Sequence, residues 1–324
     1  MLPVTAPPAL VLGDWGTSSL RLWAVAADAA VLAERRSGEG MSTLAPGAFE
    51  AVLRGHLDVL GAAPVLLCGM VGARQGWREA PYVAVPADVG SICDRVVGVA
   101  AGGLDVRIVP GLSVGGGAVG GGDAVARCDV MRGEETQLLG VLLGEPGMSG
   151  TVVMPGTHSK WVRLEGGRVS GFETAMTGEL YAVLCRHSVL RHSVGEAQGA
   201  ASGDASGEAF ARGLAAGLAA PQRLVLSLFG VRAASLLHGL GGEDAAAMLS
   251  GLLIGAEVGG AAVGSAEVGR EVVLVAGGVL ARRYGEALRS AGCRPRVVDA
   301  EAASRDGLLH VARRLWPERM MGVA

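Results

Sequence analysis

Short runs of apolar residues open the chain, and turn residues separate them. The runs at 9–14, 20–26 and 30–36 predict three β-strands joined by tight turns. The first turn reads DWGTSS (14–19), so a carboxylate and several hydroxyl groups lie at a hairpin tip. This pattern predicts a polar site at one end of a sheet.

The same order of elements returns in the second half of the chain. Residues 150–155, 160–165 and 168–174 predict three more strands. The polar tip GTHS separates the first two, and a Gly-Gly pair, typical of a two-residue hairpin turn, separates the last two. Because strand, polar tip, strand, turn and strand occur twice, the pattern predicts two related lobes that each present a hairpin tip to a shared cleft.

The remaining periodicity completes a mixed α/β pattern. Helices are predicted at 47–60, 133–143, 178–190, 206–219, 230–239, 243–263, 279–291 and 301–315. Further strands are predicted at 64–69, 106–110, 271–276 and 296–299. The Gly-rich stretch 114–122 is predicted to be a flexible linker, and 195–208 a mobile loop.

Composition narrows the class of protein. Half of the 324 residues are hydrophobic, only 4% are aromatic, and 53 are glycine, which is typical of a soluble α/β enzyme. The net charge of −3 provides no basic stripe for nucleic acid. Five cysteines without metal-type spacing, and an N-terminus without a signal pattern, predict reduced thiols in a cytoplasmic protein. The apolar stretch 249–263 contains Glu257, so we expect a helix in an interlobe core or in a dimer contact rather than a membrane span.

The two hairpin tips have the chemistry of phosphate-binding loops. Small residues let backbone N–H groups approach phosphate oxygens, and hydroxyls add donors. In the first tip these are Gly16, Thr17 and Ser18, while Asp14 is suited to hold Mg²⁺ through water. The second tip consists of Gly156, Thr157, His158, Ser159 and Lys160, whose ammonium group is suited to a phosphate oxygen. A plain polar turn is the alternative for either tip alone.

Three other motifs are candidates for parts of the same site. Gly277 and Gly278 follow an apolar strand and precede a helix, where a flat adenosine ring can lie against backbone. Glu134 and Glu135 begin a helix and are candidates to orient a hydroxyl proton, although the helix dipole also favours acidic residues there. Arg74, Gln75 and Arg78 lie in a loop after a buried strand, and arginine binds a carboxylate through two parallel hydrogen bonds.

Other common site patterns are excluded. The glycines at 115–120 match a dinucleotide fingerprint, but the acidic residue expected about 20 positions later at a strand end is missing. The chain has neither a GxxxxGK[ST] loop nor a GxSxG elbow. His187 and His192 lack the spacing of a metal site.

Taken in order, these motifs resemble the 2-dehydro-3-deoxygalactonokinase family. The resemblance runs through DWGTSSLR, CGMVGARQGWREAPY, MRGEETQLLG and PGTHSKWV and covers residues 10 to 315. It implies two ribonuclease-H-like lobes of the actin-like ATPase superfamily with an ATP cleft between them. We place the N-terminal lobe at 1–132 and the C-terminal lobe at 133–324.

The resemblance also implies a reaction. ATP and Mg²⁺ would be used to phosphorylate the 6-hydroxyl of 2-dehydro-3-deoxy-D-galactonate in galactonate catabolism. By position, Asp14 to Ser18 and Gly156 to Lys160 correspond to the two phosphate loops, and Gly277–Gly278 to the adenosine turn. The acidic pair resembles one in exopolyphosphatase relatives, and alignment slightly favours Glu135 as the group that acts on the nucleophile.

One departure and several rivals are part of this prediction. The second tip begins Pro155-Gly156, where most of the superfamily has an Asp. The nearest rivals are a kinase for a related 2-keto-3-deoxy sugar acid and a polyphosphate-type phosphatase. A non-catalytic actin-like ATP-binding module is a rival of another class.

Overall fold

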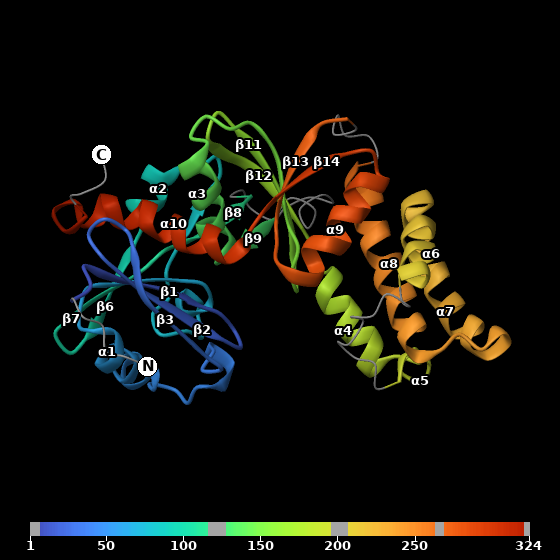
Figure 1. Ribbon diagram of the computed structural model, residues 1–324, viewed down its shortest axis with the longest axis horizontal. Helices are drawn as coiled ribbons and strands as arrows, with labels where there is room; N and C mark the ends of the chain where they lie inside the picture. The colour runs from blue at the N-terminus through green and yellow to red at the C-terminus, as the bar shows by residue number, and fades with distance from the viewer. Residues whose placement is uncertain (1–6, 116–127, 196–206, 263–268, 321–324) are drawn as a thin grey trace. The chain divides into compact units, whose positions relative to one another are not determined.

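The computed structural model describes residues 7–115, 128–195, 207–262 and 269–320 (Figure 1). Most of the Gly-rich stretches 114–122 and 195–208 lies outside these ranges, so the predictions for them are untested. The chain divides into two compact units. Unit 1 comprises Met1–Ser149, Arg163–Phe172 and Asp299–Ala324, and unit 2 comprises Gly150–Val162 and Glu173–Val298.

A six-stranded sheet forms the centre of unit 1, in the order β3-β2-β1-β4-β7-β6. Its strands are β1 (Leu10–Trp15), β2 (Leu20–Val25), β3 (Val31–Ser37), β4 (Val65–Cys68), β6 (Val97–Ala101) and β7 (Leu104–Ile108). A smaller sheet has the order β5-β8-β9, from β5 (Tyr82–Ala84), β8 (Gly111–Val114) and β9 (Asp129–Met131). The α-helices of this unit are α1 (Phe49–Leu60), α2 (Val89–Cys93), α3 (Glu134–Gly144) and α10 (Ala300–Leu315).

The five-stranded sheet of the second half has the order β12-β11-β10-β13-β14. Its strands are β10 (Gly150–Met154), β11 (Ser159–Glu165), β12 (Arg168–Ala175), β13 (Glu271–Val275) and β14 (Arg294–Val298). The helices of unit 2 are α4 (Thr177–His187), α5 (Arg191–Val194), α6 (Gly207–Ala219), α7 (Leu224–His238), α8 (Gly242–Ala262) and α9 (Gly278–Ser290). The predicted hairpin turn between β11 and β12 is confirmed, because Gly166 and Gly167 both have positive φ.

The two sheets repeat one arrangement. The order β3-β2-β1-β4-β7 of the first sheet corresponds strand by strand to β12-β11-β10-β13-β14 of the second. In each, the strand before the polar tip runs parallel to the next strand inward, β1 with β4 and β10 with β13. The predicted pair of related α/β lobes is therefore confirmed, and each has the ribonuclease-H-like strand order of the actin-like ATPase fold.

The compact units differ from the predicted division at residue 132 in the placement of α3 and α10. Both helices belong to unit 1, where they pack on each other through glycines. A Cβ on Gly140 would lie 2.1 Å from the carbonyl oxygen of Ala303, and a Cβ on Gly307 would lie 1.7 Å from that of Thr136. This backbone contact holds α10 against α3, which begins about 165 residues earlier in the chain.

Most predicted elements are present, and the exceptions have a physical reason. The strands β5, β6, β8 and β9 and the helices α2 and α5 were not predicted, because they are short and some, such as VGVAA in β6, contain poor strand formers. Helix α7 begins at Leu224, six residues before the predicted start at 230. Its apolar residues lie on more than one face, which obscures the helical period.

Helix α8 contains the apolar stretch singled out in the sequence. Among the described helices, the stretch Gly242–Ala261 is long and apolar enough to cross a membrane, and α6 with the segment Pro221–His238 passes the same test only as a pair bent by 105°. However, 72% of the most apolar window of α8 is buried inside the protein. Figure 1 shows α6 and α7 beside it. Helix α8 is therefore the central helix of unit 2.

Candidate functional site

The first polar tip joins β1 to β2 and is held by the segment that follows β3. The amide of Gly16 donates to the carbonyl of Ser19 at 2.9 Å, and the carbonyl of Gly16 accepts from Met41 at 3.0 Å. Gly40 lies so close that an added Cβ would be 2.3 Å from the carbonyl carbon of Ser18. Thr17 and Ser18 remain exposed, so this tip is a fixed backbone turn with accessible hydroxyl groups.

Asp14 lies at the base of this tip, beside the buried Cys68 of β4 in the parallel register. Burial raises the pKa of its carboxyl group, while the positive charge of Arg21 acts in the opposite direction. A bound cation would also favour the charged form. The site electrostatics therefore suit a metal near Asp14.

Two more carboxyl groups lie near the same point. Burial raises the pKa of the Cys68 thiol, and the negative charges of Asp14, Glu135 and Glu134 raise it further. Burial, and then the charge of Glu134, raise the pKa of Glu135 to about 8. Asp14 and the acidic pair of α3 are thus brought together around the end of β4.

The acidic pair has two different environments. Glu135 is fully buried, and its carboxyl group accepts hydrogen bonds from the amide of Gly133 at 2.6 Å and from the hydroxyl of Thr136 at 3.2 Å. Glu134 is partly exposed and accepts from the amide of Arg132 at 3.1 Å. The structure therefore leaves Glu134 as the more accessible of the two.

The donor set matches a magnesium ion held mainly by water and phosphate. Among the residues that the structure describes, no group of three or more His, Cys, Asp or Glu side chains closes on one ion. Mg²⁺ is usually bound through one or two carboxylates together with water and substrate phosphates. Asp14 and Glu134 fit that role, whereas a cage made of protein ligands alone does not.

Arg132 was not predicted as part of the site, although it belongs to the same motif as the acidic pair. Its guanidinium lies 4.4 Å from the ring centroid of Tyr82 and donates to the carbonyl of Ala80 at 2.7 Å. Its Nε and Nη1 atoms are buried and have no hydrogen-bond partner in the described part of the chain. Arg132 therefore joins the start of α3 to the loop 72–82, a link that spacing alone does not reveal.

The loop 72–82 presents the predicted substrate residues outward. Trp77 packs into the core against Trp15 and stacks on Phe49, with ring centroids 6.3 and 6.1 Å apart. Arg74, Gln75 and Arg78 are exposed. The aromatic anchor fixes the loop while leaving three polar side chains available to a ligand.

The second polar tip, in unit 2, is divided between exposed and buried residues. Thr157 and His158 are exposed and Gly156 is partly exposed, whereas Ser159 and Lys160 are buried. The Lys160 ammonium group donates to the hydroxyl of Thr174 at 2.8 Å, so here it lies inside the unit rather than at the open face of the tip.

The start of α4 supports this tip. The carbonyl of Thr157 accepts from the amide of Glu179 at 2.9 Å, and the His158 ring contacts the Glu179 carboxylate. A Cβ on Gly178 would lie 2.3 Å from the carbonyl oxygen of Gly156, so only glycine fits there.

A buried carboxyl group, Glu257, lies behind the tip. It accepts hydrogen bonds from the indole of Trp161 at 2.9 Å and from the hydroxyl of Tyr284 at 2.6 Å. The Tyr284 hydroxyl is also 2.9 Å from that of Ser159. Burial raises the pKa of Glu257, while hydrogen bonds from these residues and Thr177 lower it. Through Glu257, α8 is connected to the tip, to α4 and to α9.

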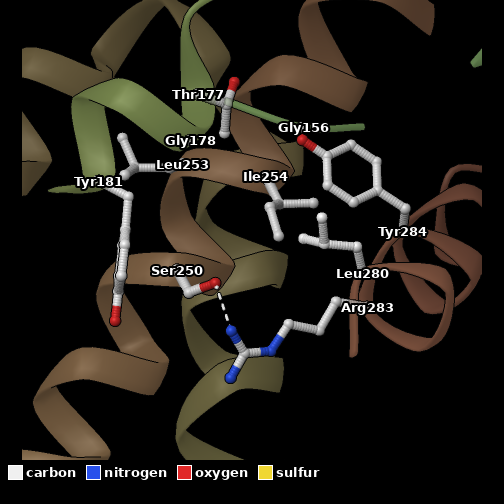
Figure 2. Close-up of a pocket in the computed structure, with 10 residues that line it drawn as sticks. All are labelled: Gly156, Thr177, Gly178, Tyr181, Ser250, Leu253, Ile254, Leu280, Arg283 and Tyr284. Atoms are coloured by element: carbon white, nitrogen blue, oxygen red, sulfur yellow. Dashed lines mark hydrogen bonds between the residues drawn. The ribbon is translucent and has the colours of Figure 1, made fainter. Parts of the chain in front are cut away.

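A pocket opens next to this network. It is lined by Gly156, Thr177, Gly178, Tyr181, Ser250, Leu253, Ile254, Leu280, Arg283 and Tyr284. Figure 2 shows these side chains converging from α4, α8 and α9, with Arg283 donating to Ser250 at 3.1 Å. Gly278, the first residue of α9, has a φ of 55°, and an added Cβ would meet no atom within 4 Å at either Gly277 or Gly278. The pocket and the Gly-Gly turn therefore offer apolar walls and open backbone in one unit.

Comparison with known proteins shows which family carries this set of motifs. The family model described as 2-keto-3-deoxy-galactonokinase matches residues 14–311. The chain belongs to the 2-keto-3-deoxy-galactonokinase family. The matched range of the family includes both polar tips, the acidic pair and the Gly-Gly turn.

Individual members of the family agree over nearly their full length. The chain is 48% identical over 307 residues to a probable 2-dehydro-3-deoxygalactonokinase from Rhizobium meliloti, covering 94% of this chain and 96% of that one. It is 37% identical to the 2-dehydro-3-deoxygalactonokinase of Escherichia coli, covering 92% and 96%. A crystal structure of a putative 2-dehydro-3-deoxygalactonokinase from Sinorhizobium meliloti superposes with a TM-score of 0.85 at 46% identity, covering 95% and 99%. The resemblance seen in the sequence motifs is thereby confirmed.

Proposed function

We propose that this protein transfers the terminal phosphoryl group of ATP to the 6-hydroxyl of 2-dehydro-3-deoxy-D-galactonate. The products are ADP and 2-dehydro-3-deoxy-6-phosphogalactonate. The single observation that carries the proposal is the family match from residue 14 to 311, which spans every motif of the two lobes. The position of the hydroxyl follows from the resemblance seen in the motifs.

Candidate nucleotide-binding residues are present within each unit. In unit 2, the pocket is lined by Leu280, which lies two residues after Gly278 on α9, and it has the apolar walls and the Tyr181 ring that suit an adenosine. The exposed parts of the two tips, Thr17 with Ser18 and Gly156 with Thr157, supply hydroxyl and backbone donors for phosphate oxygens. Ser159 and Lys160 are buried and support the second tip from inside unit 2.

Magnesium is assigned to Asp14, with Glu134 as the second carboxylate. When bound, Mg²⁺ would neutralise charge on the phosphate oxygens of ATP. Asp14 is fixed at a strand end, so its carboxylate needs little rearrangement to hold a metal-bound water.

The sugar acid is assigned to the loop 72–82 and the start of α3. Arg74, with Gln75 and Arg78, engages the C1 carboxylate, because these side chains are exposed on an anchored loop. The acidic pair orients the 6-hydroxyl. The sequence favours Glu135 for that contact, whereas accessibility favours Glu134. In the second case Glu135 supports the start of α3 through its hydrogen bonds to Gly133 and Thr136.

The first experiment measures ADP release with ATP and Mg²⁺ in the presence of 2-dehydro-3-deoxygalactonate, its gluconate epimer or no sugar acid. Turnover that depends strongly on the galactonate form supports the proposal. Equal rates with both epimers support the kinase for a wider class of sugar acids. Release without any sugar acid indicates an ATPase, and no release from a folded sample contradicts the proposal.

The role of Asp14 has its own test. We expect Asp14→Asn to reduce kcat by about 100-fold or more, because it removes a preorganised charge, with a much smaller change in the KM for the sugar acid. Asp58→Asn, an exposed carboxyl group on α1, is the matched control and should retain activity. An unchanged kcat in Asp14→Asn would exclude the metal role.

A further inference from the structure

Helix α7 is apolar on two faces. Its inner face includes Leu224, Leu228 and Val231, which pack into a core cluster of unit 2 with residues of α5 and α8. A helix that is apolar all round is normally buried on all sides. The outer face of α7 therefore needs an explanation that the fold of unit 2 does not give.

The outer face carries a continuous stripe of large apolar side chains. Five of them are exposed in the described part of the chain: Val225 (81%), Leu226 (70%), Phe229 (62%), Leu236 (62%) and Leu237 (75%). Leu226, Phe229, Ala233 and Leu236 follow each other at intervals of three and four residues, so they form one line along the helix. We call these six residues the α7 stripe.

We propose that the α7 stripe packs antiparallel against the same stripe of a second copy of this chain, around a two-fold axis. In a two-fold contact, residue i meets j and j meets i. With the axis at the level of Val231, Phe229 lies opposite Ala233, and Leu226 lies opposite Leu236. Each large ring thus meets a small residue, and the apolar ends of the stripe cover each other.

The charges of α7 favour a second copy over a charged partner. The helix contains no acidic residue and no lysine, and Arg232 donates to the hydroxyl of Ser193 inside the unit. Two copies therefore approach without like-charge repulsion. A membrane-surface helix would carry Lys and Arg on the face opposite its apolar one, but that face of α7 is itself apolar and packed.

The stripe supplies the apolar centre that a dimer contact needs. Its five large side chains are 62–81% exposed. Full burial of a Val, Leu or Phe side chain contributes about 1.5–3 kcal/mol, and the centre of an interface is its most apolar part. The polar rim that completes an interface of about 800 Å² per partner would come from residues around the helix.

The experiment is sedimentation velocity on the full chain at micromolar concentration, with circular dichroism melting to verify folding. We expect the wild type to be a dimer and Phe229→Glu and Leu226→Lys each to be folded monomers. Val59→Glu on α1, which also places a charge at an exposed apolar helix position, is the matched control and should remain dimeric. A monomeric wild type, or a Phe229→Glu dimer, overturns the proposal.

A double variant tests the register. Leu226→Lys combined with Leu236→Glu places opposite charges against each other twice across the axis, so we expect it to restore the dimer lost in Leu226→Lys. A double variant that stays monomeric overturns the antiparallel register. A monomeric wild type that sediments with anionic phospholipid vesicles would replace the second copy by a membrane surface.

Discussion

At the scale of single residues, the site depends on carboxyl groups kept in poorly solvated surroundings. Glu135 is the extreme case, because its side chain is fully buried beside a second carboxylate and bonded to the first turn of its own helix. A buried carboxyl group without a cation costs folding energy when it is ionised. With a pKa of about 8, this carboxyl group is held mainly in its neutral form near pH 7, and a nearby cation would favour its ionised form.

The buried Glu135 makes the stability of the apo protein depend on pH. Its pKa of about 8 when folded lies above the usual 4.5, so its stabilising contribution is complete below about pH 4.5 and is lost as pH rises towards 8. We expect Glu135→Gln to gain stability relative to the wild type over this range. The gain should reach a few kcal/mol, since each pKa unit corresponds to about 1.4 kcal/mol.

Urea unfolding of both proteins without nucleotide, at several pH values from 4.5 to 8, measures this difference. Glu134→Gln is an informative comparison, because the charge of Glu134 contributes to the raised pKa and its removal should flatten the profile only in part. Parallel profiles for the wild type and Glu135→Gln would contradict the assignment.

At the scale of elements, glycines set how closely helices approach. In unit 2, α6 and α8 touch through their backbones. An added Cβ on Gly213 would lie 2.1 Å from the carbonyl oxygen of Met248, and one on Gly251 would lie 2.2 Å from that of Phe210. This close approach explains why α8 contains so many small apolar residues, because they let its backbone contact that of α6.

Two substitutions on α8 separate close packing from helix propensity. We expect Gly251→Ala to lower the free energy of unfolding by about 1–3 kcal/mol or more, because the methyl group collides with backbone that has no room to move. Gly260→Ala on the same helix meets no atom within 4 Å and should be neutral or stabilising by up to about 1 kcal/mol. Urea denaturation of both variants gives the comparison, and equal effects would exclude the close contact.

Glu257 connects α8 to the second polar tip, so its removal should affect nucleotide binding. Glu257→Ala leaves the buried donors of Trp161 and Tyr284 without their acceptor, which costs about 1–3 kcal/mol each. We expect a KM for ATP raised about tenfold or more, with a smaller change in the KM for the sugar acid. Glu257→Gln keeps an acceptor oxygen and should recover much of the affinity. Equal changes in both KM values would indicate a loss of general structure instead.

At the scale of the whole molecule, the repeated lobes were predictable because their signal is local. Periodicity and turn residues alone predict the two strand–tip–strand patterns, the Gly166–Gly167 turn and the long helices. All of these are present in the structure. The placement of α10 in unit 1 was not predictable, because it depends on contact between Gly140 and Gly307, which are about 170 residues apart in the sequence.

The candidate site also has a part that the sequence predicted and a part that depends on tertiary contacts. The sequence motifs predicted Asp14, Glu134 and Glu135 as site residues, and in the structure they lie around Cys68. Arg132 and Glu257 were missed as members, because their partners lie on other elements and a lone Arg or Glu gives no periodic signal. The burial of Lys160 likewise depends on tertiary contacts, so it could not be predicted from the sequence of the tip.

Because α10 packs on α3, β1 and β4, unit 1 should need it to fold. We expect a chain that stops after Val298 to lose cooperative unfolding of unit 1 and to aggregate, since the apolar face covered by α10 becomes exposed. A control chain that stops after Met320 keeps every described element and should behave as the wild type. Soluble expression and a cooperative melt of the shorter chain would contradict this expectation.

Unit 1 is built from three separate segments of the chain, and this affects how it folds during synthesis. Helix α3 ends at Gly144 and α10 begins at Ala300, so the ribosome must add some 155 residues between the two partners. At about 5–20 residues per second, this interval lasts roughly 8–30 s. Throughout that time the nascent unit 1 has an uncovered apolar face, while most of unit 2 emerges. Helix α10 therefore completes unit 1 only after most of unit 2 has been made. A nascent chain stalled before residue 300 exposes an apolar surface that a chaperone can bind.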